Sequence, residues 1–216
     1  MLTSAWRCLA GNRERGRVSA RSQRHETGNK LEEHIRLIRG QISKSLDDPA
    51  TRVLAAALVS GNFDSMTDPR TGEPVPVVPF HGRWYRGAAS WDDARSLCAM
   101  RDYRCEVTAI WNFVVLNVRY TQDQDGEDTY STVRATLEQG AGDCDDLTVL
   151  FAALLKAVGY ENIVARVVSI QGATWDHIYS LVMLPKGQWI AMDATERGHH
   201  LGWEYQNVAA KRDFAL

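Results

Sequence analysis

The sequence predicts one domain that combines helices with a small sheet, preceded by an N-terminal appendage. Apolar residues recur every three or four positions in several segments, as on helices that bury one face. Three shorter runs near the end, NIVARVVSI, HIYSLVML and QWIAMD, have the composition and length of strands. With 216 residues and 44% hydrophobic composition, the chain is long enough and apolar enough to fill one core.

The first residues are set apart by their charge. The net charge of −2 hides a start in which residues 1–24 carry six arginines and one acid, Glu14. Such a segment is typical of a disordered tail, a targeting address or an arm that touches nucleic acid, and we expect a disordered basic arm over residues 1–28. The apolar runs are far shorter than the roughly 20 residues of a membrane helix, so we expect a soluble protein without membrane contact.

Two helices and a connector are predicted next. Apolar spacing indicates a helix over residues 30–46. Asp48 followed by Pro49 is typical of the start of a second helix, which should stop near Gly61. Residues 68–87 hold four of the six prolines, so we expect an irregular or extended connector there.

The middle of the chain predicts further helices and an acidic loop. A helix is expected over residues 91–117 with a break near 101–104, and a short helix should end at Gly140. The stretch QDQDGED at 122–128 has some features of a calcium loop but lacks the full ligand spacing. We therefore expect a solvated turn at 122–128.

The four cysteines are Cys8, Cys98, Cys105 and Cys144. None forms a CxxC pair, which argues against a zinc ribbon and against a thioredoxin-type motif. Cys98 and Cys105 lie one heptad apart in a helical stretch, and we expect them to be small buried residues. The spread of the cysteines favours a reducing compartment.

The stretch QGAGDCDD at 139–146 opens the most apolar helix, predicted over residues 143–158 and followed by Gly159. Asp143 can cap this helix with Asp146 as its partner. Cys144 then occupies the first helical position, where unpaired backbone N–H groups favour a thiolate. The neighbouring carboxylates oppose a thiolate, so a basic partner is needed.

The predicted strands supply that partner. His177 opens the second strand and Asp193 closes the third. A three-residue turn over 185–187 would pair Tyr179 with Asp193 and bring His177 within side-chain reach of Asp193, whereas a two-residue turn would separate them. Together with Cys144 these residues would form a nucleophile, a base and an orienting carboxylate. The alternative is three residues with no relation to one another.

A family resemblance favours the first interpretation. GAGDCDDLTVLFAALLKAVGYENIVARVV, WDHIYSLVML and GQWIAMDAT resemble, in order, the core of the transglutaminase-like superfamily over about residues 105–195. More loosely, VRYTQDQDGEDTYSTVRATLEQG is similar to transglutaminase-like proteins encoded among tailed-phage structural genes. The resemblance implies a papain-like α+β fold, in which the helix bearing the nucleophile packs on a small antiparallel sheet and extra helices precede the core.

The resemblance also implies roles and domains. Cys144 would be the nucleophile, His177 the general base and acid, and Asp193 the group that orients the imidazole, in acyl transfer through a thioester that needs no cofactor and no metal. We divide the chain into three parts, which are the basic arm at 1–28, the N-terminal helices and proline-rich connector at 29–88, and the catalytic core with a C-terminal tail at 89–216.

Four further residues bear side chains that could belong to the site. Gln139 is a candidate oxyanion donor beside the Cys144 backbone N–H, although a surface glutamine is commoner at a helix end. Trp175 is a candidate wall of the substrate cleft, or an ordinary packed aromatic residue. His199 and His200 lack a third metal ligand, so we expect them in a solvated tail.

Two functions remain after this reading. The first is a cysteine-dependent enzyme that transfers or hydrolyses an amide or peptide bond of a protein or peptide substrate. The second is a non-catalytic structural or assembly module, such as a component of a phage virion that contacts other phage structural proteins. We expect a cytoplasmic protein or one incorporated into a phage particle, and nucleic-acid contact by the basic arm is a weaker expectation.

Overall fold

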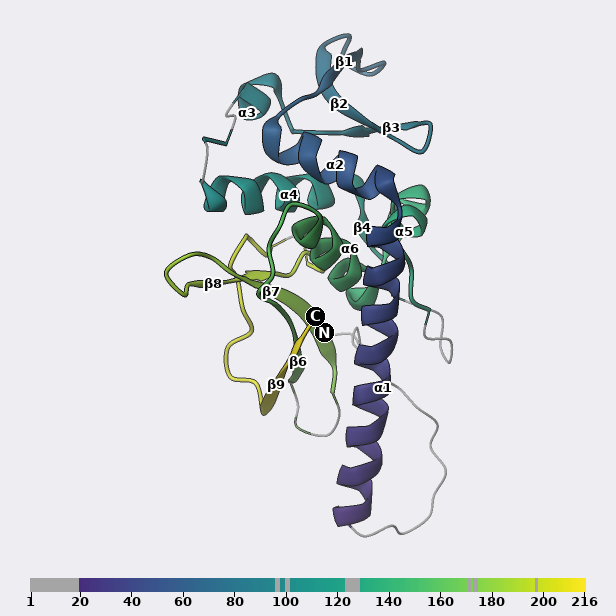
Figure 1. The fold of residues 1–216 in the computed structure, drawn as a ribbon, viewed down its shortest axis with the longest axis vertical. Coiled ribbons are helices and arrows are strands. Elements are labelled where there is room, and N and C mark those ends of the chain that lie inside the picture. The colour runs from purple at the N-terminus through teal and green to yellow at the C-terminus, as the bar shows by residue number, and fades with distance from the viewer. Residues whose placement is uncertain are drawn as a thin grey trace, which may run out of the picture.

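The computed structural model describes residues 20–95, 98–99, 102–122, 129–170, 172, 175–196 and 198–216. Helices gather on one side of a four-stranded antiparallel sheet, and a smaller three-stranded sheet lies at the far end of the helical layer (Figure 1). The α+β class predicted from the sequence is confirmed. Among the described residues, no helix combines the length and the hydropathy that a membrane crossing requires.

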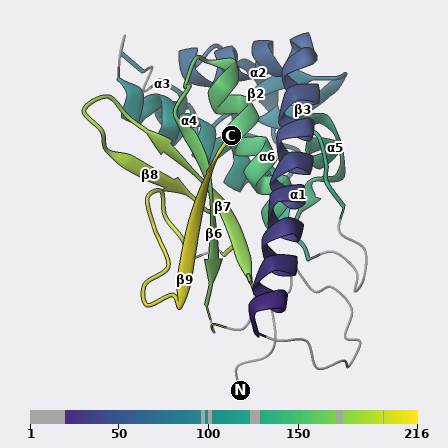
Figure 2. The same cartoon turned by 60° about the horizontal axis from the view of Figure 1, so that its bottom comes forward.

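The larger sheet is built from the C-terminal part of the chain. Its strands are β6 (Ile163–Ser169), β7 (His177–Met183), β8 (Trp189–Met192) and β9 (Ala210–Ala215), in the order β8-β7-β6-β9 (Figure 2). The first three are the strand-like runs of the sequence, and β9 was not predicted. Its segment AKRDFA has one apolar side chain that is buried, Phe214, so it lacks the alternating pattern that marks a half-buried strand.

Alternation of side chains gives this sheet two different faces. Ile178 and Val182 of β7 belong to the main core, which also contains Ala165 of β6. Tyr179 and Leu181 lie in a separate small cluster on the opposite face, together with Val168 and Ala191. The main core therefore fills the space between the sheet and the helices.

Helix α6 (Cys144–Ala157) is the central element of this core. Asp143 caps it by accepting hydrogen bonds from the backbone N–H groups of Asp145 and Asp146 at 3.0 and 3.1 Å. All residues from Cys144 through Leu155 are buried, because α6 packs between the sheet and other helices on every side. The predicted start and cap are confirmed, and Gly159 takes the left-handed conformation expected after the last turn (φ 99°).

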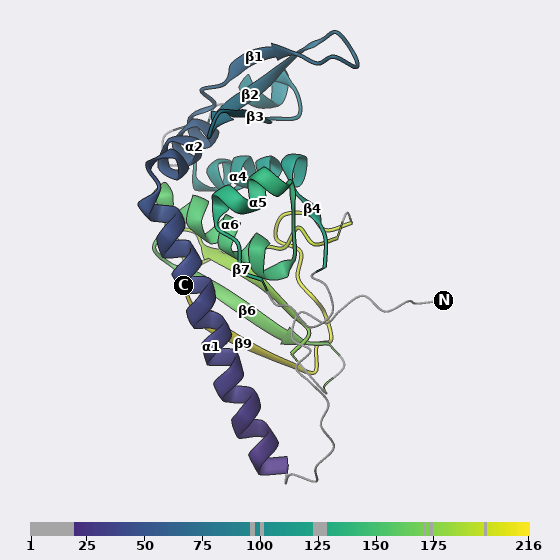
Figure 3. The same cartoon turned by 90° about the vertical axis from the view of Figure 1, so that its right-hand side faces the viewer.

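Helices α1 (Ala20–Asp47) and α2 (Pro49–Ser60) confirm the two N-terminal helices, and Asp48 caps α2 as predicted. Helix α1 runs along α6 and past the edge of the sheet (Figures 1 and 3). Residues 20–28 are part of α1, so the prediction of a disordered arm is wrong for them, and residues 1–19 lie outside the described residues. The helical pattern was missed there because this stretch is polar throughout.

The proline-rich connector is largely extended, as one of the two expected forms, and its extended segments pair into a sheet that was not predicted. Its strands are β1 (Asp64–Thr67), β2 (Pro74–Phe80) and β3 (Arg83–Arg86), all antiparallel. Prolines lack the N–H that a central strand normally donates, so the content of β2 argued against a strand. They still accept hydrogen bonds, and Gly87 N donates to Pro76 O at 3.0 Å.

The segment before α6 holds several short elements. They are α3 (Trp91–Arg95), α4 (Tyr103–Asn117), β4 (Arg119–Tyr120), α5 (Val133–Gln139) and β5 (Ala141–Gly142). The predicted helix over 91–117 is interrupted, although residues 103 and 104 of the expected break already belong to α4. Asp102 caps α4 by accepting from Cys105 N at 3.0 Å. The predicted acidic loop covers residues 122–128. Of these, Gln122 is described, and residues 123–128 lie outside the described residues.

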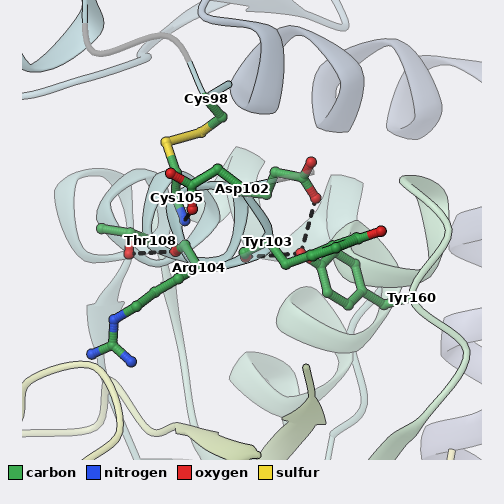
Figure 4. Close-up of a disulfide and its surroundings, with 8 residues drawn as sticks. Cys98, Asp102, Tyr103, Arg104, Cys105, Thr108 and Tyr160 are labelled. Carbon is green, nitrogen blue, oxygen red and sulfur yellow. Dashed lines mark hydrogen bonds between the residues drawn. A yellow bond between two sulfur atoms is a disulfide. The ribbon is translucent and has the colours of Figure 1, made fainter. Parts of the chain in front are cut away.

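Cys98 and Cys105 form a disulfide at the start of α4, with their Cα atoms 5.3 Å apart (Figure 4). The expectation of two reduced, small buried residues is therefore wrong. In a continuous helix a separation of seven residues spans about 10 Å, and the break before α4 is what lets the sulfurs meet. Disulfides persist in oxidising compartments, so this one argues against the predicted reducing, cytoplasmic location. The location stays a prediction.

Gly142 lies directly under the first turn of α6, and this explains the glycine of the GDC motif. A Cβ on Gly142 would stand 2.8 Å from Asp146 Cβ and 3.2 Å from Thr136 Cγ2. We expect Gly142→Ala to lower the free energy of unfolding by about 1–3 kcal/mol because neither neighbour can retreat without moving a helix. Chemical denaturation would measure the loss, and an unchanged midpoint would contradict it.

A matched control for this substitution is Gly40→Ala. Gly40 lies in an exposed part of α1, and an added Cβ would meet nothing within 4 Å. The same change should there raise the free energy of unfolding by up to about 1 kcal/mol, because alanine is the better helix former.

Candidate active site

Cys144 is the first residue of α6, and its side chain is completely buried. Its Sγ lies 3.9 Å from Asp145 Oδ1. The structure records Cys144 as disulfide-bonded. A nucleophilic role would belong to the reduced protein, in which the helix N-terminus favours a thiolate.

His177 and Asp193 form a buried pair, with 2.9 Å between His177 Nε2 and Asp193 Oδ2. The predicted register produces it. Leu184 N donates to Gln188 O at 2.8 Å across the turn, and Ser180 pairs with Met192. One step further along this register Tyr179 faces Asp193, so His177 is the diagonal neighbour.

The turn itself differs in one respect from the prediction. Gly187 has a positive φ of 80°, and Lys186 also has a positive φ of 77°. Gly187 N donates to Leu184 O at 3.1 Å, so residues 184–187 form a β-turn with Pro185 in its second position.

Asp193 is held by other groups in addition to the predicted contact with His177. Its Oδ1 accepts hydrogen bonds from Thr195 N at 3.1 Å and Thr195 Oγ1 at 2.7 Å. Burial alone would raise the pKa of Asp193, but the charge and hydrogen bond of His177, with the nearby His199 and the hydrogen bonds from Thr195, lower it well below the ordinary value of 3.8. Asp193 is therefore an anion at all physiological pH values.

His199 belongs to this site, which corrects its assignment to a solvated tail. Its Nδ1 lies 3.5 Å from Asp193 Oδ2 and its side chain is 5% exposed. The ring stacks on Trp203 with 3.6 Å between centroids. The physical reason is this aromatic packing, which folds the segment after Asp193 back onto the sheet. His200 remains exposed as expected.

Two tyrosines surround the imidazole of His177 and were not predicted. The ring of Tyr205 meets it edge-on at 5.2 Å, and the ring of Tyr179 stacks near it at 5.6 Å. Tyr179 could have been found, because it follows His177 by two positions on a strand and so shares its face. Tyr205 could not, because it lies in an irregular segment whose path the sequence does not reveal.

These tyrosines also line a cavity of about 410 Å³. Glu204, Val208 and Lys211 complete part of its wall. Burial raises the pKa of both tyrosines, with a further contribution from Glu204 to Tyr179 and from Asp193 to Tyr205, so both hydroxyls stay protonated.

Helix α1 shows where the N-terminus of α6 lies along the sheet. Glu32 Oε1 accepts a hydrogen bond from Arg212 Nη2 of β9 at 2.8 Å. Two residues later, His34 Nε2 lies 3.1 Å from Asp145 Oδ1 at the start of α6. In the sheet, Arg212 faces Val167 of β6. The start of α6 is therefore level with this part of β6.

The register of β6 and β7 shows that His177, the predicted base, is close to the level of the start of α6. Val167 faces Ile178, the neighbour of His177. One helical turn beyond Cys144, the backbone oxygen of Thr148 accepts a hydrogen bond from Ser180 Oγ at 3.1 Å. Helix α6 therefore runs in the direction of β7, and Cys144 and His177 occupy the same end of it.

The side chain of His177 nevertheless belongs to the face of β7 that is opposite to α6, the helix that carries Cys144. Ser180 points toward α6, whereas His177 and Tyr179 alternate with it and belong to the opposite face. Because His177 is the first residue of β7, a direct contact between the Cys144 sulfur and its imidazole would have to form around the end of the strand. The pairing of His177 with Asp193 is present, and the approach of Cys144 stays a prediction.

The secondary candidates are placed as follows. Gln139 is the last residue of α5 and is exposed, and Trp175 is half-buried against the main core. Among the described residues, Asp143, Cys144 and Asp145 bring potential metal ligands within 4.8 Å of one another. The Asp143 carboxylate already caps α6 and the Asp145 carboxylate already contacts His34, so both have structural tasks.

Comparisons with known proteins place this site in a family context. The family model of the transglutaminase-like superfamily matches residues 94–194. No curated protein sequence matches the chain significantly. Two similar solved structures are a Cytophaga hutchinsonii protein described as a cysteine protease (TM-score 0.38, 17% identity, 61% of this chain and 49% of that one) and EGTA-treated Legionella pneumophila LapG (TM-score 0.28, 13% identity, 79% and 64%). The chain therefore spans about half of the first protein and less than two thirds of the second.

Proposed function

Because residues 94–194 belong to the transglutaminase-like superfamily, we propose that the protein is a cysteine-dependent enzyme that transfers or hydrolyses the acyl group of an amide or peptide bond. The observation that carries the proposal is the buried pair of His177 and Asp193 at the start of β7. Acyl transfer by a thiol at a helix start needs such a basic group held by a carboxylate, and the approach of Cys144 to this pair is part of the proposal.

The chemistry proceeds in two balanced steps. His177 takes the proton of the Cys144 thiol, the thiolate adds to the carbonyl carbon, and the imidazolium protonates the leaving amine as the thioester forms. Water or an amine then adds to the thioester, His177 accepts its proton and the thiolate leaves. Because Nε2 is bound to Asp193, the ring nitrogen that exchanges the proton is Nδ1.

Two predicted groups would assist this reaction. The backbone N–H of Cys144 would donate to the oxyanion, with Gln139 as the second donor. Gln139 is exposed at the end of α5 and would have to turn inward to do so. Trp175 would form part of the wall that holds the acyl group, and the substrate would be a protein or peptide.

One observation favours a second candidate, a non-catalytic structural or assembly module. Cys144 and His177 are both 0% exposed, so a substrate reaches them only after a movement of the surrounding chain. Buried cysteines without access are normally inert. In this alternative the fold would serve contacts with other proteins, such as structural proteins of a phage particle.

Thiol reactivity decides between the two candidates. In a Cys8→Ser variant, Cys144 is the one cysteine outside the Cys98–Cys105 disulfide, so its alkylation by iodoacetamide at pH 6 can be followed by peptide mapping. We expect the folded protein to react at least tenfold faster than the same chain unfolded in urea, because activation of the thiol raises its thiolate fraction at this pH. A folded protein that reacts more slowly than the unfolded chain would favour the structural module.

A further inference from the structure

A second buried histidine approaches the start of α6 from outside the family core. His34 belongs to α1, whereas the family match begins at residue 94. Its Nε2 lies 3.1 Å from Asp145 Oδ1, and the two side chains are 5% and 1% exposed. The same oxygen lies 3.9 Å from Cys144 Sγ. One carboxylate oxygen therefore links this histidine to the sulfur.

The orientation of His34 is fixed by its surroundings. Its Nδ1 makes a hydrogen bond with the hydroxyl of Tyr130, and the two rings meet edge-on at 5.1 Å between centroids. The neighbouring residues Leu31, Ile35 and Ile38 of α1 are buried in the main core. The imidazole is thus held against Asp145 by a hydrogen bond on its far side and by the packing of its own helix.

Charge explains why this contact matters for the sulfur. A carboxylate about 4 Å from a thiolate disfavours it, and the effect is strong where water is excluded. The carboxylates of Asp143 and Asp146 are taken up by the helix cap and by the backbone N–H of Ser131. A carboxylate oxygen of Asp143 also lies within 4.8 Å of the sulfur. Asp145 Oδ1 lies 3.9 Å from the sulfur, and His34 donates to this same oxygen.

We propose that His34 is a positioning residue for Cys144, which binds the Asp145 carboxylate and so reduces its repulsion of the thiolate. The proposal rests on the proposed function of Cys144. It assigns α1 a part in the chemistry, because the helix delivers the donor that compensates an acidic residue of the nucleophile's own first turn.

The test is a double-mutant cycle read out as the rate of Cys144 alkylation at pH 6 in the Cys8→Ser protein. His34→Phe keeps a ring but removes both nitrogens, and should slow alkylation about tenfold, which corresponds to about one pKa unit of the thiol. Adding Asp145→Asn removes the repelling charge and should restore the rate to within about threefold of the parent protein. Asp145→Asn alone should change the rate by less than about threefold, because its charge is already compensated.

Conservative and matched variants separate this role from a structural one. His34→Gln keeps an N–H donor near the position of Nε2 and should stay within about threefold of the parent rate. Glu32→Gln, on the same helix, neutralises only the exposed ion pair with Arg212 and should leave the rate unchanged. A folded His34→Phe protein with the parent rate, or a slow one that Asp145→Asn does not restore, would overturn the proposal.

Two further variants keep the test decisive if His34→Phe does not fold, and separate this inference from the proposed function. Should His34→Phe fail to fold, Tyr130→Phe removes the hydroxyl that fixes His34 Nδ1 and should slow alkylation in the same direction, and an unchanged rate would then count against the proposal. His177→Asn should slow alkylation whether residue 145 is Asp or Asn. Failure of the proposed function would therefore show as no effect of His177→Asn, and failure of the present inference as no coupling between residues 34 and 145.

Discussion

Replacement of His177 by Asn should lower turnover on the order of a thousandfold or more, the largest effect we expect of any single change outside Cys144. Without the imidazole no group takes the thiol proton or protonates the leaving amine. An ordinary thiol with a pKa of about 8.5 is only about 0.3% thiolate at pH 6, so Cys144 alkylation at this pH should also fall, about a hundredfold. Ammonia release from a glutamine-containing peptide and iodoacetamide kinetics would measure the two effects.

The control for this change is the integrity of the fold. Asn retains a donor that can reach Asp193, so the melting temperature should shift little while both rates collapse. A His177→Asn protein that reacts as fast as the parent protein would show that other groups are sufficient to activate Cys144. Such a result would remove His177 from the mechanism.

Replacement of Asp193 by Ala should keep the fold while lowering turnover on the order of a hundredfold or more. The carboxylate binds His177 Nε2 at 2.9 Å, so its loss frees the ring to rotate and to adopt the wrong tautomer. His199, 3.5 Å from the same carboxylate, cannot replace it because it carries no acceptor of equal charge. Steady-state kinetics should show the loss in kcat more than in KM, and intact kcat would remove Asp193 from the mechanism.

The same residue makes a prediction about acid. The pKa of Asp193 is lowered in the folded protein, so its ionisation contributes stability that is fully present above the ordinary value of 3.8 and is lost as the pH falls below it. Asp193→Asn removes a group that titrates. Between pH 5 and pH 2 the variant should therefore lose less free energy of unfolding than the parent protein, as urea denaturation at each pH would show. Equal losses of the free energy of unfolding in the two proteins would mean that protonation of Asp193 does not destabilise the fold.

The elements that could be predicted are those whose signals are local. The caps at Asp48 and Asp143 were correct because a short polar side chain before an apolar run satisfies the first N–H groups of a helix. The pairing of His177 with Asp193 followed from a three-residue turn and the two-residue period of strands. In both cases a few neighbouring residues determine the geometry.

The parts that could not be predicted depend on contacts between distant segments. His199 enters the site because its ring stacks on Trp203, and His34 because α1 packs along α6, and neither contact leaves a periodic trace in the sequence. The disulfide of Cys98 and Cys105 formed where the helix is interrupted, which spacing alone did not reveal. The opposite faces of Ser180 and His177 likewise needed the observed packing of α6.

The burial of Leu31, Ile35 and Ile38 in the same core as α6 has a practical consequence for anyone who seeks the smallest active fragment. A protein trimmed to residues 89–216 would retain the segment matched by the family model, residues 94–194, yet leave an apolar face of α6 open to water. Such a fragment should aggregate or remain molten, and the shortest version that behaves well in solution should start before residue 31.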